Sequence, residues 1–125
     1  MQFTLAVVSA FLAASISAAP ATFPTIRVQL ANDFSGANTD VYVVANDAPN
    51  DISTLFAGSA VDLNGAIIAT SVQLTQFVDN ISCIITAGGA DVATVTTDDT
   101  FSFFNGNDKA VETNLTGDVL TCEVV

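Results

Sequence analysis

Alternation of apolar and polar residues is the main pattern in this chain, and it predicts short strands. Successive side chains of a strand point to opposite faces, so a half-buried strand alternates with a period of two. Residues 25–31, TIRVQLA, follow this pattern, with the apolar set Ile26, Val28 and Leu30 opposite the polar pair Arg27 and Gln29. A turn-rich segment leads to a second predicted strand at 41–44, VYVV, and the two strands should pair as neighbours.

The longest apolar stretch, residues 67–86, predicts two strands that are separated by a break at Asp79-Asn80. Its first part alternates without an interruption up to Phe77, which is compatible with one strand. In its second part Cys83 lies on the apolar face. We therefore expect Cys83 to point into the core.

Further strands are expected at 92–97, 101–104 and 119–125, with tight turns between them. Asn-Gly and Gly-Gly pairs mark these turns, because both residue types tolerate positive φ. Asp51 or Ser53 can cap a single helical turn. The pattern predicts an all-β fold: a small antiparallel β-barrel or sandwich of about seven to eight strands, with at most one short helical turn.

Length and composition limit the chain to one domain. It has 125 residues, half of them apolar, which is enough for one hydrophobic core and too few for two domains. Residues 1–19 hold no charged side chain and end in small residues, and their apolar stretch is shorter than the ~20 residues of a membrane span. They predict a secretory signal peptide. Residues 20–125 should then form a single β domain that is secreted and extracellular.

The charge of the chain excludes several kinds of partner. Thirteen acidic residues against Arg27 and Lys109 give a formal net charge of −11. Nucleic acid binding requires clustered cations, and attraction to anionic lipid headgroups requires the same, so we expect no nucleic acid partner and no membrane insertion. The acidity suits a cationic or neutral partner, or only keeps an exported domain soluble. It should also keep copies apart, which predicts a monomer.

Two cysteines, Cys83 and Cys122, both lie in the part that is predicted to be exported. Thiols oxidise outside the cell, so one disulfide is expected, either across the core or between adjacent strands. The competing interpretation, two free reactive thiols, lacks the basic or histidine neighbours that lower a thiol pKa. Closing a loop of about forty residues would stabilise the fold by ~4 kcal/mol in the chain-entropy model.

Signatures of catalysis are sparse. The chain contains no histidine, which removes the usual base of hydrolases and the commonest metal ligand. Two carboxylates could still hydrolyse glycosides, and Asp33, Asp40, Asp47 and Asp51 are expected in neighbouring loops that could converge. These segments do not match the spacing of an EF-hand, and turn formation explains their Asn and Asp residues better than calcium binding does. We therefore expect a protein that is not an enzyme and that has no metal site and no cofactor.

Two asparagines, Asn80 and Asn114, each begin an N-glycosylation sequon, NIS and NLT. Asn114 lies in a predicted loop and is the better candidate. Asn80 precedes an inward-facing cysteine by three residues. It should be modified only if it lies at an exposed strand start.

Three phenylalanines, Phe101, Phe103 and Phe104, lie close together near one predicted strand. Alternation places two of the rings on one face and one on the other. Core packing is the better interpretation for all three. Phe104 is the candidate for an exposed aromatic residue at an interaction surface.

Four segments cover most of the predicted mature chain in a characteristic order: RVQLANDFSGANTDVYV, STLFAGSAV, IIATSVQLTQFVDNISCII and DTFSFFNGN. This series resembles the small secreted fungal proteins called hypersensitive-response-inducing protein elicitors. The resemblance implies a compact β-barrel, the pairing of Cys83 with Cys122, and no catalytic residues. It also implies perception at plant cells, where such proteins trigger defence responses and local cell death, and where some assist infection.

The expected function is that of a secreted fungal elicitor or effector that binds a host surface protein or a cell-wall component. One alternative is a small carboxylate-dependent glycosidase, which needs two carboxylates in one cleft. Another is a structural protein of the cell wall, in which exposed sheet edges would mediate adhesion.

Overall fold

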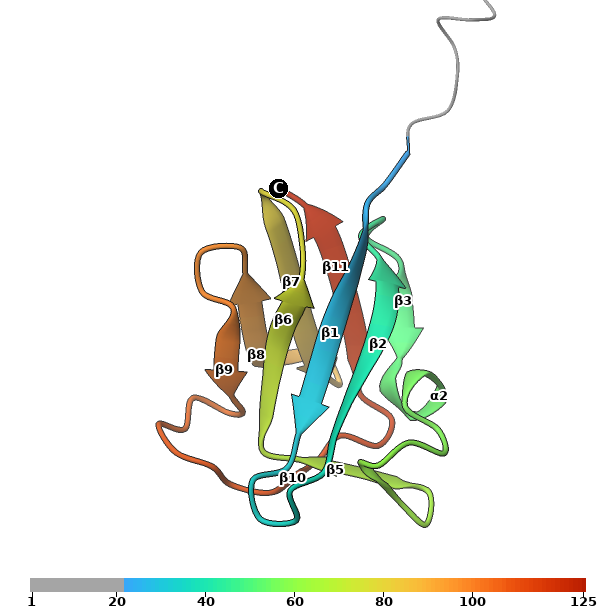
Figure 1. Cartoon of the computed structure of the whole chain (residues 1–125), viewed down its shortest axis with the longest axis vertical. Helices are drawn as coiled ribbons and strands as arrows, with labels where there is room; N and C mark the ends of the chain where they lie inside the picture. Colours follow the sequence, from blue (N-terminus) through green and yellow to red (C-terminus); the bar gives the residue numbers. More distant parts are fainter. Residues whose placement is uncertain (1–21) are drawn as a thin grey trace, which may run out of the picture.

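The computed structural model describes residues 22–125, which form eleven strands and one short helix (Figure 1). The predicted signal peptide, residues 1–19, lies outside the described residues. The elements in chain order are β1 (Thr25–Ala31), β2 (Asn38–Val44), β3 (Pro49–Asp51), α2 (Ile52–Leu55), β4 (Asp62–Leu63), β5 (Ala66–Ala69), β6 (Ser71–Gln76), β7 (Ile81–Ala87), β8 (Ala90–Thr96), β9 (Phe101–Phe103), β10 (Thr113–Asn114) and β11 (Val119–Val124). The all-β prediction is confirmed, with more and shorter strands than expected.

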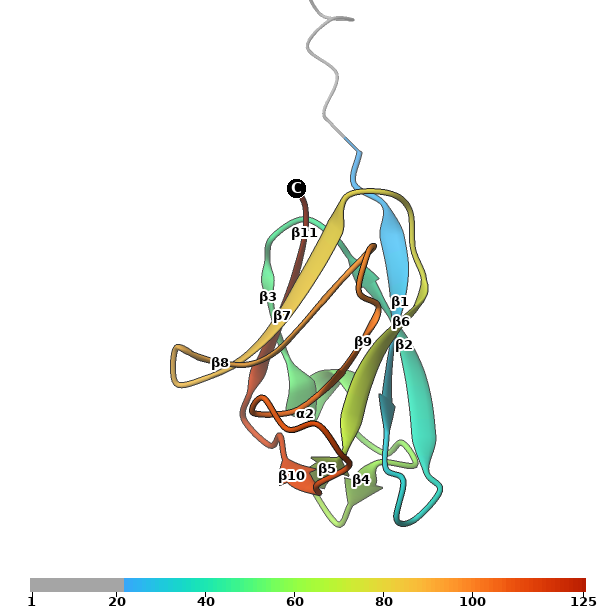
Figure 2. The ribbon, with the colours of Figure 1, turned by 90° about the vertical axis from the view of Figure 1, so that its left-hand side faces the viewer.

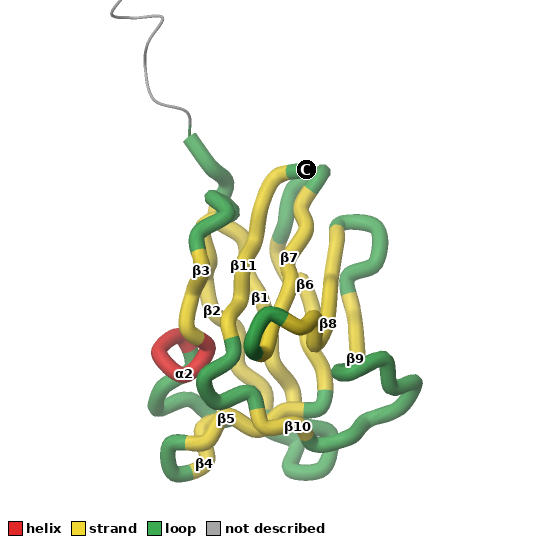
Figure 3. Tube along the Cα trace, turned by 180° about the vertical axis from the view of Figure 1, so that it is seen from behind, coloured by secondary structure: helices red, strands yellow, loops and turns green. Residues whose placement is uncertain are grey.

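Two antiparallel sheets of four strands face each other and enclose the core (Figure 2). The first sheet has the order β2-β1-β6-β9, and the second has the order β3-β11-β7-β8. Figure 3 shows the molecule from the side of the second sheet. A small third sheet, β10-β5-β4, lies at one end of the sandwich. The strands of residues 22–125 form a sandwich and no closed barrel, so the first sheet keeps two edges and one solvent-facing side.

The predicted pairing of the first two strands is confirmed. β1 and β2 pair along their whole length, from Thr25 opposite Val44 to Ala31 opposite Asn38. β1 also pairs with β6 on its other side, with a register shift between Arg27 and Val28. This central position buries one face of β1 completely and leaves its polar face toward solvent.

The predicted uninterrupted strand up to Phe77 is wrong, because the chain bends at Thr70. The Thr70 side chain is buried, and both its backbone N–H and its hydroxyl donate to the carbonyl of Ala31, at 2.7 and 3.1 Å. The same hydroxyl accepts a hydrogen bond from the backbone N–H of Asp33 at 3.1 Å. These contacts end β5 and start β6 in a different sheet. The predicted break at Asp79-Asn80 is confirmed, since β7 begins directly after it.

Local turn chemistry behaves as the sequence predicts. Asp51 is the N-cap of α2, and its carboxylate accepts a hydrogen bond from the backbone N–H of Ser53 at 3.2 Å. Such a cap satisfies one of the free N–H groups of a helix start. Asn64 and Gly65 both have positive φ, 56° and 95°, as the tight turn between β4 and β5 requires.

One hydrophobic core is shared by the sheets and by α2. Its largest fully buried side chains are Phe56, Phe104, Ile26, Leu30, Ile52, Ile67, Leu74, Ile81, Ile85, Leu115, Leu120 and Val28. The expectation for the phenylalanine cluster is corrected here: Phe104 is fully buried, whereas Phe101 is 42% exposed and Phe103 is half-buried. Phe104 follows the end of β9, where the next residue, Asn105, donates its N–H to the carbonyl of Val92 at 2.7 Å. This contact ties the end of β9 to β8 and brings Phe104 over the core.

Candidate functional site on the exposed face of the four-stranded sheet

The solvent-facing side of the β2-β1-β6-β9 sheet is the most distinctive surface of the molecule, and we call it the outer face. Strand register decides its members, because residues that are directly opposite each other in paired strands project to the same side. The outer face comprises Arg27, Gln29, Asp40, Tyr42, Gln73, Thr75, Phe101 and Phe103. The residues that alternate with them on β1 and β6 include Ile26, Val28, Leu30, Val72 and Leu74, which are buried in the core.

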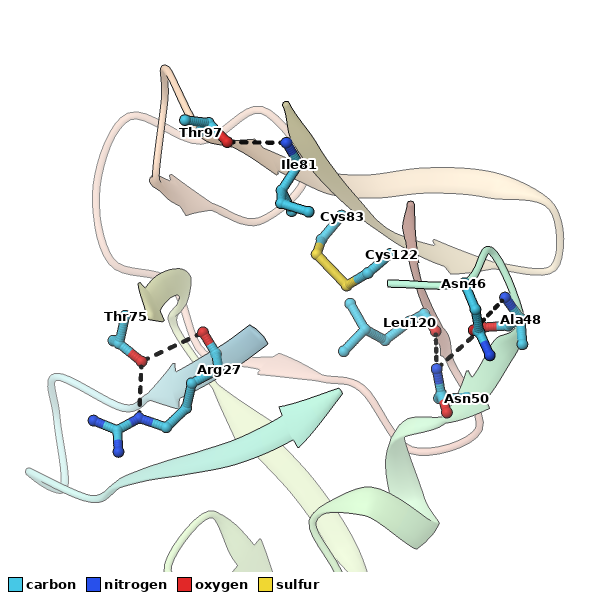
Figure 4. Close-up of a disulfide and its surroundings, with 10 residues drawn as sticks. All are labelled: Arg27, Asn46, Ala48, Asn50, Thr75, Ile81, Cys83, Thr97, Leu120 and Cys122. Atoms are coloured by element: carbon cyan, nitrogen blue, oxygen red, sulfur yellow. Dashed lines mark hydrogen bonds between the residues drawn. A yellow bond between two sulfur atoms is a disulfide. The ribbon is translucent and has the colours of Figure 1, made fainter. Parts of the chain in front are cut away.

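Arg27 anchors one part of the outer face. Its Nε lies 3.2 Å from Oδ2 of Asp40, and it also donates to the hydroxyl oxygen of Thr75 at 3.5 Å. The guanidinium carbon lies 5.8 Å from the centre of the Tyr42 ring, which is within the range of a cation–π contact. Arg27 therefore holds a ring, a carboxylate and a hydroxyl in fixed positions (Figure 4 draws its contact with Thr75).

The outer face carries no net charge, although the chain is strongly acidic. The four strands of the sheet contain two charged residues, Arg27 and Asp40, and these form the ion pair. The other twelve of the thirteen acidic residues lie in loops, in the second sheet or in the small third sheet. Apart from the paired Asp40, the acidic residues of the molecule therefore lie outside the strands of this face.

Amide side chains occupy the middle of the outer face. Gln29 lies between Asp40 on β2 and Gln73 on β6, and Gln73 lies opposite Phe101 on β9. This row crosses all four strands and is ~14 Å long at the usual strand spacing. No partner within the described residues takes up the side-chain amides of Gln29 and Gln73 at hydrogen-bond distance, so these amides are free for an external ligand.

Exposed aromatic rings gather at the first sheet. Among residues 22–125, the aromatic side chains that are largely exposed are Phe23, Phe34, Tyr42, Phe77 and Phe101. Tyr42 and Phe101 lie in strands of this sheet, Phe77 directly follows β6, and Phe23 and Phe34 lie in the segments that precede and follow β1. Tyr42 is 61% exposed on β2, at one margin of the outer face. Phe101, at the other margin, packs edge-to-face against Phe103 with ring centres 5.0 Å apart.

The predicted disulfide is present and joins adjacent strands. Cys83 on β7 and Cys122 on β11 are directly opposite each other, with Cα atoms 4.1 Å apart (Figure 4). Both residues are buried in the core, as the inward-facing pattern predicts. Of the two arrangements that the sequence leaves open, the bond between neighbouring strands is correct. It closes a loop that contains β8, β9 and β10.

Both sequon asparagines are exposed and lie outside the outer face. Asn114 lies in the two-residue strand β10 and not in the predicted loop, and its side-chain oxygen accepts a hydrogen bond from the backbone N–H of Thr116 at 2.9 Å. Asn80 has a φ of 64° and directly precedes β7, so it does lie at an exposed strand start. Glycosylation at the two positions remains a prediction.

The acidic residues proposed for a glycosidase do not converge. Asp33 lies in the loop before β2 and Asp47 in the loop after it, so this strand separates them, and Asp51 is used as the cap of α2. Asp40 is bound to Arg27. Within residues 22–125 there is no group of three or more Asp, Glu, Cys or His side chains that could hold a metal ion.

A separate open hollow of about 390 Å³ lies between the ends of β7 and β8 and the C-terminal residue. It is lined by Asp79, Asn80, Ile81, Thr96, Thr97, Asp98 and Val125. Glycoside hydrolysis depends on two carboxyls in different environments. Asp79 and Asp98 are both exposed, so burial does not distinguish an acid from a nucleophile.

One carboxyl elsewhere has a perturbed pKa. Partial burial raises the pKa of Asp118 above its usual value, because desolvation disfavours the ionised form. Asp118 lies just before β11, and its backbone carbonyl accepts from the N–H of Ile52 at 3.0 Å. Asp118 therefore lies next to α2 and β3. It belongs neither to the lining of the hollow nor to the outer face.

No helix within residues 22–125 has the length and the apolar character needed to cross a membrane. Comparisons of the chain with family models, with curated proteins and with solved structures gave no match.

Proposed function

We propose that this protein is a secreted fungal elicitor or effector, which acts by binding at the surface of a plant host. The outer face carries this proposal: it is an exposed surface without net charge, with free amides and aromatic rings on a rigid sheet. Exposed aromatic residues that are gathered on one side of a small domain are typical of interaction surfaces. The resemblance to hypersensitive-response-inducing proteins supplies the biological setting.

The disulfide supports an extracellular role. Disulfides form and persist in oxidising compartments, and Cys83–Cys122 ties two central strands of the second sheet together. The predicted signal peptide and the two exposed sequons are consistent with passage through the secretory path. Secretion would bring the outer face into contact with host walls and membranes.

Infiltration of the purified mature protein into leaves tests this function. At micromolar doses we expect an oxidative burst, induction of defence genes or local cell death in at least one of several plant species. The matched control is the same protein after reduction and heat unfolding, which keeps the composition and removes the folded surface. Absence of all three responses across the hosts would contradict the elicitor role.

A glycosidase is the second candidate, and the hollow beside Asp79 and Asp98 is the observation that favours it. Release of reducing sugars from plant and fungal wall polysaccharides is the assay. Activity that disappears in both Asp79→Asn and Asp98→Asn, and persists in Asp108→Asn, would establish the enzyme. Equal background release by all four proteins would remove this candidate.

A further inference from the structure

We infer that the outer face binds a neutral polysaccharide chain, lying across the strands from Tyr42 to Phe101. The inference rests on the proposed function, because it names the ligand class of the surface to which that function is assigned. Its basis is the combination of free amides, exposed rings and local neutrality described above. Each of these three features excludes some classes of ligand.

The charge of the protein determines which classes of polymer can bind to the outer face. An acidic polysaccharide would have to approach a molecule with a net charge of −11, and the twelve acidic residues elsewhere in the molecule would repel it. A cationic polymer would be attracted to the carboxylates elsewhere in the molecule rather than to the face, whose single carboxylate, Asp40, is already paired with Arg27. A neutral ligand meets no electrostatic penalty on the face itself.

The distribution of apolar groups favours a sugar over a protein partner. A protein–protein interface has an apolar, aromatic centre and a polar rim. The outer face has the opposite arrangement, since the amides of Gln29 and Gln73 lie in the middle and the rings of Tyr42 and Phe101 lie at the margins. A polymer with hydroxyl groups along its length and apolar C–H faces matches such a surface.

The side chains offer suitable contacts for such a polymer. Each glutamine amide provides two donors and an acceptor, which suits adjacent sugar hydroxyls that both donate and accept. Aromatic rings present a flat apolar surface to the C–H face of a sugar ring. The chain contains no Trp, so Tyr42 and Phe101 are the rings that stack, and Phe103 and Arg27 hold them in place.

The rest of the molecule leaves this face accessible. The two sequon asparagines, Asn80 and Asn114, lie outside its four strands, so glycans attached there do not originate on it. The sheet is stiffened by pairing of β1 on both sides. A preformed, rigid surface reduces the ordering cost of binding an extended chain.

Isothermal titration with defined oligosaccharides tests the inference. The probes are neutral hexasaccharides of β-1,4-glucan, β-1,3-glucan and chitin, with oligogalacturonate as the anionic probe and chitosan oligomers as the cationic one. We expect binding to at least one neutral probe with little dependence on salt, because no ion pair forms. We expect no binding of oligogalacturonate.

Alanine variants locate the site. Tyr42→Ala and Phe101→Ala should each weaken binding of the neutral probe roughly tenfold, through loss of a stacking ring. Gln73→Ala should weaken it as well. Phe34→Ala is the matched control, since Phe34 is 67% exposed but lies in the loop between β1 and β2. All four side chains are at least partly exposed, so circular dichroism should show unchanged folding.

Several results would overturn the inference. These are no binding of any neutral probe at millimolar concentration, equal binding by wild type and the Tyr42→Ala/Phe101→Ala double variant, or salt-sensitive binding of chitosan alone. Leaf infiltration separates the two proposals. A leaf response without glycan binding rejects the glycan inference alone, and if the double variant also loses that response, the outer face binds a partner other than a neutral glycan. Glycan binding without a leaf response rejects the elicitor role alone.

Discussion

Asp118 is a partly buried carboxyl that directly precedes β11. Its pKa is raised by desolvation, so the folded state disfavours the ionised carboxylate. The native state therefore keeps the carboxyl proton of Asp118 more readily than the unfolded chain does, and this difference makes the free energy of unfolding depend on pH. The related stability is therefore fully present below the unfolded pKa and is lost as the pH rises through the folded value.

Asp118→Asn should therefore raise the melting temperature slightly at pH 7 and leave it unchanged near pH 3, where Asp118 is protonated in both states. Thermal unfolding at several pH values measures this. Asp108→Asn, in the exposed segment between β9 and β10, is the control because it removes the same unit of negative charge. Equal stabilisation by both variants at pH 7 would assign the effect to net charge instead of burial.

The two sequons make a second prediction for single residues. Expression in a fungal or yeast secretion host should give a protein that carries a glycan at Asn114, with lower occupancy at Asn80. Asn114→Gln should remove most of the added mass and Asn80→Gln less of it, as intact-mass spectrometry will show. A protein modified at Asn80 and bare at Asn114 would contradict the ranking.

The disulfide acts at the scale of two elements. Cys83 and Cys122 are opposite each other on β7 and β11, which are hydrogen-bonded strands in the middle of the second sheet. The bond closes a loop across a sequence separation of 39 residues. In the chain-entropy model such a loop stabilises the native state by about 4 kcal/mol, through restriction of the unfolded chain.

Cys83→Ala/Cys122→Ala should therefore lower the free energy of unfolding by about 4 kcal/mol, measured by urea denaturation. Reduced wild-type protein is the control, because it keeps both sulfur atoms and lacks only the bond. A loss below about 1 kcal/mol in both proteins would show that the disulfide restricts the unfolded chain much less than the chain-entropy model assumes.

Strand positions could be predicted from the sequence because they depend on local periodicity. The inward pattern of β1, the cap at Asp51 and the turn at Asn64-Gly65 are all local features. The bend at Thr70 could not be predicted, since it depends on hydrogen bonds to Ala31 and Asp33 in a distant segment. The burial of Phe104 and the exposure of Phe101 could not be predicted either, because they too depend on contacts between distant segments.

Only part of the outer face could be predicted from the sequence. The polar side of β1, Arg27 and Gln29, is visible from alternation alone. Its neighbours Tyr42, Gln73 and Phe101 join it only through the registers of three strand pairs that are far apart in the chain. One signal could have suggested the face: its four strands contain almost no charge in a strongly acidic chain.

At the scale of the whole molecule, net charge should control self-association. β2 is a seven-residue strand at the edge of its sheet, and such an edge can pair with another chain. At neutral pH the charge of −11 keeps copies apart. Near pH 4.1, the isoelectric point, this repulsion vanishes.

Light scattering should therefore show a monomer at pH 7 in low salt and larger species near pH 4. Proline in place of Tyr42, whose backbone N–H faces the open edge of β2, should reduce the association at pH 4. A stable dimer at pH 7 and low salt would contradict the prediction of a monomer.

The loop that the Cys83–Cys122 disulfide closes also determines how the protein responds to proteolysis. Trypsin has two target residues in the chain, Arg27 in the middle of a paired strand and Lys109 in the exposed segment between β9 and β10. Cleavage after Lys109 separates Cys83 from Cys122 along the backbone but leaves them bonded. The expected product is a two-chain molecule that runs as one band without reductant and as two bands with it. A protease that cuts after Lys109 would therefore leave all four strands of the outer face in one disulfide-linked molecule.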